Sequence, residues 1–355
     1  MERMTGDINT KIFDSEIFLR LNAVNVSPEQ PVLLHGIAGS LWAFVASALF
    51  RQANGQVLVV VADEERAEKL RDDCATILGD ALVRLCIVDH RHASQAMDMS
   101  GPLSQIETMK ALQSNTPAVY ITHATALGFG LPDRQEFSRS VIELSVKSER
   151  NFEELLIQLT EYGFERKQFV ESYGDFAVRG GILDIFPFIG EHPVRIEFWG
   201  DTVESIREFE VLSQRSIRDL HAVSLIPDVL RKKEVNEGIQ EKPETKVSLL
   251  SYFSPETTIF SDDPSLLEKE FIEMESEGLT TDYSFDEVRT GLNRFAQFIH
   301  SSFNSSDAEI DFRSQSQPSV NGSMKVLREK IAEYSDRGFD VIITSDRKEE
   351  LERIQ

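Results

Sequence analysis

The chain has 355 residues, of which 60 are acidic and 37 are Lys or Arg, and its formal net charge at pH 7 is −23. This length predicts two or three domains, and a negative charge of this size disfavours nucleic acid as a partner because it repels phosphate backbones. The sequence shows no signal peptide and no apolar run approaching about 18 residues, so we expect a cytoplasmic protein without a membrane span. The two cysteines, Cys74 and Cys86, and the seven scattered histidines lack metal-ligand spacing, which predicts reduced thiols and no bound metal.

The first part of the chain alternates between predicted strands and helices. After a weakly patterned start with one possible short helix at 15–21, the expected strands cover 31–35, 56–61, 82–88 and 118–122, and the expected helices cover 41–50, 64–78 and 105–112. Asp63 is expected to cap the helix at 64–78. Repeated alternation of this kind is typical of a parallel sheet that helices cover on both faces.

The turn after the first expected strand has the frame of a phosphate-binding loop, in which a strand, a glycine turn and a helix follow one another. When it is aligned on Gly36, Gly39 and Ser40, the sequence carries Leu41, Trp42 and Ala43 where a working loop has Gly, Lys and Thr. The Lys that neutralises phosphate charge and the hydroxyl that holds Mg²⁺ are therefore missing. We interpret the segment as a degenerate loop that uses glycine for its geometry and does not hydrolyse nucleotide.

Residues 174–220 form the most strand-like part of the sequence. Apolar and polar residues alternate along it, and glycines interrupt the runs at Gly180, Gly190 and Gly200, which predicts a small antiparallel meander. A helix at 151–162, ended by Gly163, is expected before it. Apart from one histidine, all five basic residues of the meander are arginines: Arg179, Arg195, Arg207, Arg215 and Arg218. Arginine favours bidentate pairing with carboxylates, so we expect a protein-recognition face.

The rest of the chain returns to strand and helix patterning after a polar linker at 231–245. Elements are expected at 247–253, 258–260 and 264–274, so the meander is predicted to be inserted into the first domain. Beyond residue 303 the sequence predicts a helix at 324–334, a strand at 340–344 and a helix from 346 onward. One strand between two helices is half of a domain, so we expect this unit to continue beyond Gln355.

Several strings carry a resemblance to a known family. They are GDFAVRGGILDIFP at 174–187, PVRIEFWGD at 193–201, SIREF at 205–209, SQRS at 213–216 and ATALGFGLP at 124–132. Over nearly its whole length the chain resembles the N-terminal, UvrB-like modules of bacterial transcription-repair coupling factors. UvrB itself has an intact phosphate loop and a Tyr-rich hairpin that grips DNA. Here the loop is broken and residues 89–100 contain no Phe, Tyr or Trp, so the coupling factors are the better match.

The resemblance implies a fold and a division into domains. The fold is α/β: a RecA-like or UvrB-like parallel-sheet domain with a degenerate phosphate loop, an inserted α+β domain with an antiparallel sheet, and the start of a further small α/β domain. The expected boundaries are 1–149 for the first domain, 150–228 for the insertion, 229–303 for the segment completing the first domain, and 304–355 for the last unit.

The resemblance also implies a function. In that family the inserted domain recruits UvrA, which brings excision repair to a polymerase stalled at damage, and the module is neither catalytic nor cofactor-binding. ATP and Mg²⁺, RNA polymerase and double-stranded DNA are expected to bind only through the further domains of a translocase, and this chain is expected to be monomeric. Carried over to this sequence, the UvrA-facing surface includes Arg179, Arg195, Phe198 or Trp199, and Asp201. Strand alternation makes Trp199 the better exposed anchor and places Phe198 in the core.

Three alternatives remain open from the sequence. Arg179 could pair within the sheet with Asp184 or Glu197, in which case it serves local structure. The chain could be a fragment of a UvrB-type DNA-remodelling ATPase or helicase, which nucleotide turnover would reveal. It could also regulate its own protein by masking the UvrA-binding surface against a C-terminal domain.

Overall fold

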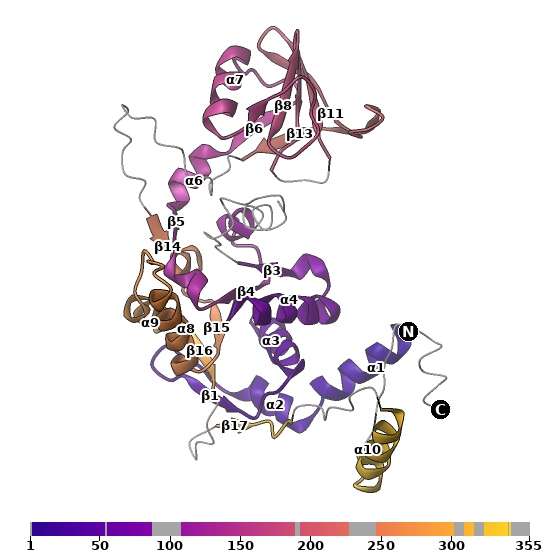
Figure 1. Ribbon diagram of the computed structural model, residues 1–355, viewed down its shortest axis with the longest axis vertical. Coiled ribbons are helices and arrows are strands. Elements are labelled where there is room, and N and C mark those ends of the chain that lie inside the picture. Colours follow the sequence, from indigo (N-terminus) through magenta and orange to yellow (C-terminus); the bar gives the residue numbers. More distant parts are fainter. Residues whose placement is uncertain are drawn as a thin grey trace. The chain divides into compact units, whose positions relative to one another are not determined.

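The computed structural model describes residues 2–53, 55–86, 108–188, 192–226, 246–301, 309–315, 323–339 and 341. The chain divides into two compact units, Met1–Arg313 and Ser314–Gln355 (Figure 1). Predictions for 87–107, 227–245, 340 and 342–355 lie outside the described residues, and these include the aromatic-free segment at 89–100, the linker and the last expected strand and helix.

A seven-stranded sheet forms the centre of the first unit, and every pairing that the structure describes in it is parallel. Its strands, in spatial order, are β17 (Ile310–Asp311), β1 (Val32–His35), β16 (Ala296–His300), β15 (Thr258–Ser261), β2 (Val57–Val61), β4 (Val119–His123) and β3 (Val83–Leu85). The predicted strands at 31–35, 56–61, 118–122 and 258–260 are confirmed. The strand predicted at 82–88 begins later, because Asp80–Leu82 forms a 3₁₀ turn.

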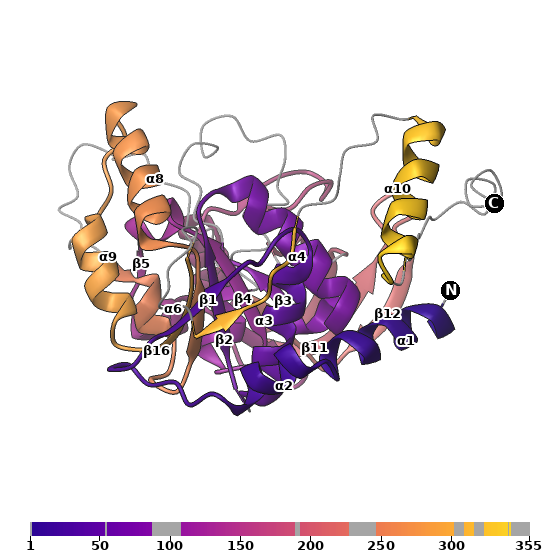
Figure 2. The same cartoon turned by 90° about the horizontal axis from the view of Figure 1, so that it is seen from below.

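Helices cover both faces of this sheet, as the alternation predicted. Along β2, Leu58 and Val60 pack in one apolar cluster and Val57, Val59 and Val61 pack in another. The first cluster includes side chains of α8 (Pro264–Ser276) and α9 (Phe285–Leu292), and the second includes side chains of α3 (Leu41–Gln52) and α4 (Glu64–Leu78). Figure 2 shows the two helix groups on either side of the strands. A continuous run of apolar residues, buried at every position of β2, suits a strand covered in this way.

The ends of the helices follow the capping signals in the sequence. Asp63 precedes α4, and its Oδ1 accepts the backbone N–H of Arg66 at 2.9 Å, as predicted. The short helix expected at 15–21 is confirmed as α2 (Glu16–Ala23), and it is preceded by α1 (Glu2–Phe13), which was not expected. Phe18 and Leu21 of α2 are buried in the cluster that contains α3, so tertiary packing stabilises a segment whose own pattern is weak.

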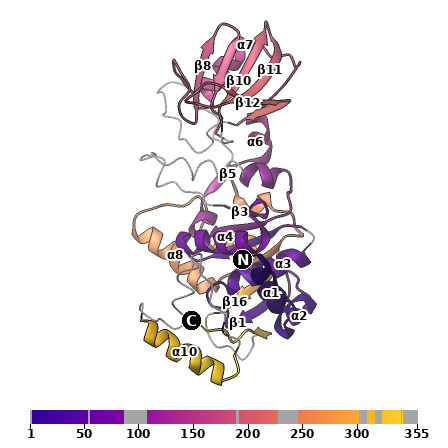
Figure 3. The ribbon, with the colours of Figure 1, turned by 90° about the vertical axis from the view of Figure 1, so that its right-hand side faces the viewer.

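The antiparallel meander is also confirmed. Its six strands lie in the order β12 (Ser216–Leu220), β11 (Thr202–Phe209), β10 (Val194–Trp199), β9 (Ile182–Ile185), β8 (Asp175–Arg179) and β7 (Glu165–Arg166), with only the β7–β8 pair parallel. Helix α7 (Phe152–Glu161) accompanies this sheet (Figure 3). Leu155 and Leu159 of α7 and Leu183, Ile196 and Ile206 of the sheet are buried in the same apolar cluster. We call the α7 side the inner face and the opposite side the outer face.

Two short strand pairs flank this sheet in the sequence, and our sequence analysis did not predict them. β6 (Ile142–Ser145) pairs with β13 (Ala222–Leu225), and β5 (Gly130–Pro132) pairs with β14 (Lys246–Ser248). Strands β15, β16 and β17 of the parallel sheet follow the meander in the sequence, so the meander is inserted between strands of that sheet. The expected domain boundaries remain predictions.

In the second unit, α10 (Met324–Asp336) confirms the helix predicted at 324–334. Across the described parts of both units, no helix combines the length and the apolar character needed to cross a membrane.

Candidate protein-recognition surface

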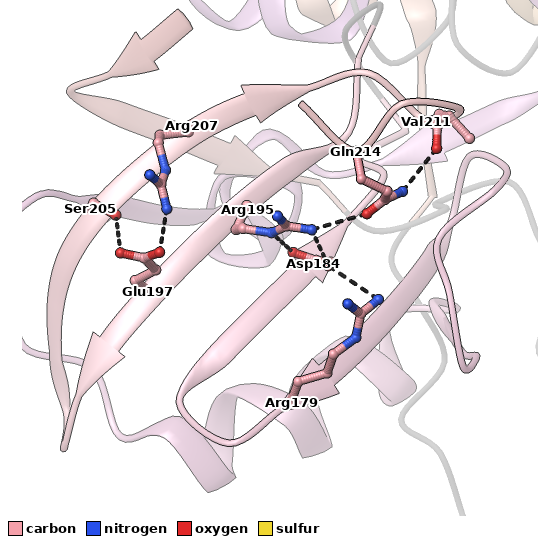
Figure 4. A network of polar contacts seen from close by, with 8 residues as sticks. All are labelled: Arg179, Asp184, Arg195, Glu197, Ser205, Arg207, Val211 and Gln214. Carbon is pink, nitrogen blue, oxygen red and sulfur yellow. Dashed lines mark hydrogen bonds and ion pairs between the residues drawn. The ribbon is translucent and has the colours of Figure 1, made fainter. Parts of the chain in front are cut away.

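The outer face of the meander presents a row of charged side chains. Strand register places Asp184 of β9 beside Arg195 of β10, and Arg195 beside Arg207 of β11. The neighbouring row places Glu197 beside Ser205. Side chains in such rows project to the same side of a sheet and can contact one another. Figure 4 shows the resulting network of polar contacts.

Asp184 is the buried centre of this network, with 3% of its side chain exposed. Arg195 binds it with two hydrogen bonds, from Nε to Oδ1 at 2.6 Å and from Nη2 to Oδ2 at 2.9 Å. The hydrogen bond to Asp184 raises the pKa of Arg195, and the guanidinium also lies 4.7 Å from the ring centroid of buried Phe209. Only 20% of the Arg195 side chain is exposed. Arg195 therefore neutralises a buried carboxylate.

Arg179 shares the same carboxylate but is held more loosely. Its Nη2 lies 3.7 Å from Asp184 Oδ2, beyond hydrogen-bond distance, and 47% of its side chain is exposed. The guanidinium rests 4.9 Å from the ring centroid of Phe169, a half-exposed residue of the loop between β7 and β8. The pairing of Arg179 with Asp184 that the sequence left open is thus present in a weak form. Glu197 instead accepts hydrogen bonds from Arg207 and from Ser205, the latter at 2.9 Å.

The three other predicted surface residues follow Glu197. Trp199 is 81% exposed at the end of β10, whereas Phe198 is 8% exposed and packs against Phe152 at a centroid distance of 4.9 Å. The expected burial of this pair is confirmed. Asp201 lies in the next turn, where its Oδ1 accepts the backbone N–H of Phe152 at 3.1 Å at the start of α7. The structure therefore gives Asp201 a structural contact that joins the turn after β10 to the start of α7.

Sequence reasoning missed two residues that contact Arg179 and Arg195. Phe169 lies in a loop without strand alternation, so no pattern marked it. Gln214 was noticed only as part of the SQRS string, yet its Oε1 accepts a hydrogen bond from Arg195 Nη2 at 3.0 Å. A glutamine in a turn gives no sequence signal for a contact with a strand 19 positions earlier.

The residues that the sequence analysis aligned with a phosphate-binding loop lie in the turn at 36–40 and at the start of α3. Gly36 has φ +66°, and a Cβ there would lie 2.7 Å from the backbone nitrogen of Arg313. Gly39 and Ser40 are exposed, Leu41 is half-buried and Ala43 is buried in α3.

Trp42, in the position aligned with the phosphate-loop Lys, is 4% exposed. Its ring stacks on Phe260 at a centroid distance of 4.3 Å, and the guanidinium of Arg66 lies 4.4 Å from it. The aromatic side chain at position 42 therefore packs in the core and supplies no cation to the turn. Among the described residues, no three His, Cys, Asp or Glu side chains are grouped to hold a metal ion.

Comparison with known proteins agrees with the family resemblance. Residues 142–230, which include the whole outer face, match the family model described as the UvrB interaction domain. The chain is 30% identical over 197 residues to the transcription-repair-coupling factor of Bacillus subtilis, a match that covers 55% of this chain and 17% of that protein. The protein of the same name from Mycobacterium tuberculosis is 33% identical over 206 residues (56% and 16%), and that from Staphylococcus aureus 27% over 244 residues (67% and 20%). The matches thus span between 16% and 20% of these relatives.

Proposed function

From the similarity to transcription-repair-coupling factors and the match to the UvrB interaction domain, we propose that this chain is a non-catalytic docking module that binds UvrA through the outer face of its meander. In that role it recruits the excision machinery to an RNA polymerase stalled at DNA damage. The observation that carries the proposal is that strand register places two exposed side chains on the same face: the 81% exposed indole of Trp199 and the loosely held, 47% exposed guanidinium of Arg179.

The chemistry of this face suits a partner surface that offers a carboxylate next to an apolar pocket. Arg179 is able to leave Asp184 for a partner carboxylate because Arg195 keeps both Asp184 oxygens bonded. The buried charge of Asp184 therefore stays neutralised when Arg179 moves. Trp199 supplies the large aromatic area that is typical of energetically dominant interface residues.

The test is a calorimetric titration of UvrA with the wild-type chain, Arg179→Ala and Trp199→Ala. We expect each substitution to weaken binding by about fivefold or more, since loss of a central interface residue costs about 1–2 kcal/mol or more. Arg218→Ala is the matched control: it removes the same charge from the same sheet, but the register of Glu208 with both Val194 and Arg218 places it on the inner-face side. Unchanged affinity in both test variants, or an equal loss in the control, would remove this surface from the proposal.

We propose no nucleotide role for the turn at 36–40. Trp42 brings no charge to this turn and is buried against Phe260, and the nearby guanidinium of Arg66 bonds Asp262 at 2.5 Å. The UvrB-type ATPase alternative predicts saturable ATP binding or turnover by the chain. Either result in an equilibrium binding or phosphate-release assay would revive that alternative.

The remaining roles concern a longer protein. We propose that contacts with RNA polymerase and double-stranded DNA, and the chemistry of ATP and Mg²⁺, belong to regions outside this chain. The masking hypothesis predicts that the chain binds UvrA more tightly than a full-length protein does. Equal affinities in the same titration would argue against masking.

A further inference from the structure

Gln214 has an unusual backbone conformation for its residue type. It lies in the turn between β11 and β12 with φ +57°, in the left-handed region that residues other than glycine and asparagine rarely adopt. Hydrogen bonds close the turn around it: the Gln214 N–H donates to the carbonyl of Glu210 at 2.8 Å, and the Glu210 N–H donates to the carbonyl of Arg215 at 2.9 Å. A strained position that surrounding bonds hold in place is a reason to look for a role of its side chain.

The side chain of Gln214 bridges the turn to the outer face. Its Nε2 donates to the carbonyl of Val211 at 2.8 Å, which leaves Oε1 to accept from Arg195 Nη2 at 3.0 Å (Figure 4). Both ends of the amide therefore have a partner of the right kind, which defines its orientation. Val211 itself packs against a small apolar cluster on the outer face, formed by Val170, Ala177 and Phe186.

A guanidinium has five N–H donors in a rigid plane. In Arg195, Nε and one N–H of Nη2 go to Asp184, and the second N–H of Nη2 goes to Gln214. Three donors on two edges of the planar group are thus fixed, and this sets the direction of the two donors on Nη1. Asp184 alone would hold one edge of the group.

We propose that Gln214 is a positioning residue for UvrA recognition, which together with Asp184 fixes the guanidinium of Arg195 so that Nη1 meets a partner carboxylate without further ordering. The inference rests on the proposed function of the outer face. Because Arg195 is already immobilised before UvrA binds, its ordering adds no entropy cost to binding. Arg179 is then the mobile arginine of the pair and Arg195 the fixed one.

The informative substitution is Gln214→Gly, because glycine adopts φ +57° without strain and so preserves the turn while removing the amide. We expect UvrA binding to weaken by about two- to tenfold, the effect of leaving one side chain to be ordered on binding. The melting temperature should stay the same or rise. Gln214→Asn, which tolerates the same backbone but is one methylene shorter, should behave like the glycine variant.

A double-mutant cycle separates positioning from a general structural role. Arg195→Lys keeps the charge beside Asp184 but lacks the fork that reaches Gln214. In that background Gln214→Gly should cause no further loss of UvrA affinity. An equal loss in both backgrounds would overturn the inference, since Gln214 would then act independently of Arg195.

A second readout does not involve UvrA. In the nitrogen NMR spectrum of arginine side chains, the Nη2 protons of Arg195 should exchange slowly with water in the wild type and faster in Gln214→Gly. Unchanged exchange would show that Gln214 does not fix the guanidinium of Arg195. If exchange accelerates and Arg179→Ala weakens UvrA binding while Gln214→Gly does not, the positioning role fails and the docking surface stands. If none of the outer-face variants changes the affinity, both proposals fall together.

Discussion

Replacing Arg195 by alanine would leave Asp184 as a buried carboxylate whose nearest remaining cation, Arg179, lies 3.7 Å away. Breaking a buried ion pair from one side costs about 3–5 kcal/mol, because the remaining charge stays desolvated and uncompensated. Two features reduce that figure here: 20% of the Arg195 side chain is exposed, and Arg179 is able to move closer. We therefore expect Arg195→Ala to lower the free energy of unfolding by about 2–4 kcal/mol, and Arg179→Ala to lower it by less than about 1 kcal/mol.

The assay is urea unfolding followed by circular dichroism, combined with hydrogen exchange of the backbone amides in β9, β10 and β11. Exchange in these strands should accelerate in Arg195→Ala and change little in Arg179→Ala. Arg195→Leu combined with Asp184→Leu removes both charges, so it should recover at least half of the lost stability. Equal destabilisation by the two single alanine variants, or no recovery in the double variant, would refute the assignment of Asp184 as a buried charge that depends on Arg195. Weaker UvrA binding by Arg195→Ala must accordingly be compared with the loss of folding stability in the same variant.

Further predictions concern other sites. Trp42→Ala should lower the unfolding free energy by about 3–5 kcal/mol in the same assay, because it empties a buried site stacked on Phe260; a loss below about 1 kcal/mol would contradict that packing. Burial raises the pKa of Cys74 to about 12 and raises that of Cys86 as well, so iodoacetamide at about pH 8 should label neither thiol before urea unfolds the chain and both afterwards, as mass spectrometry would show. Hydrogen bonds at the start of α9 lower the pKa of Glu287, so its stabilisation is present above the ordinary glutamate pKa and lost as pH falls through the lowered one. Glu287→Gln should therefore flatten the decline in melting temperature between about pH 5 and 3, and an unchanged decline would refute the link.

The sequence predicted five of the seven strands of the parallel sheet because those strands carry strong local signals, and it did not predict β16 or β17. The continuous apolar run of β2 and the aspartate before α4 each specify an element without reference to distant residues. The short pairs β5–β14 and β6–β13 could not be predicted in the same way. Each joins segments about 80 or more positions apart, and none of the four strands stood out in the sequence as a separate alternating run. Helix α1 was missed because its middle contains several residues of low helix propensity, among them Thr5, Gly6 and Asn9.

The candidate site was predictable to the extent that strand alternation determines it. The side of the sheet taken by Trp199 and by Phe198 follows from their adjacent positions in β10. Alternation also places Arg179 and Arg195 on one face, but it does not predict that Arg195 is held more tightly than Arg179. Their difference depends on how closely each one approaches Asp184, on Phe169 from a loop and on Gln214 from a turn, and strand alternation predicts none of these distances.

The pairing on the outer face bears on how such a surface achieves recognition in a chain of net charge −23. Asp184 and Glu197 balance Arg195 and Arg207, so the outer face carries little uncompensated positive charge. Long-range attraction of an acidic partner is correspondingly weak, because paired charges produce a field that falls off within a short distance. Selectivity must then come from contact geometry: the plane of a fixed guanidinium, the reach of a mobile one and the fit of an exposed indole. This explains why arginine occupies these positions, since lysine carries the same charge but cannot present a defined plane.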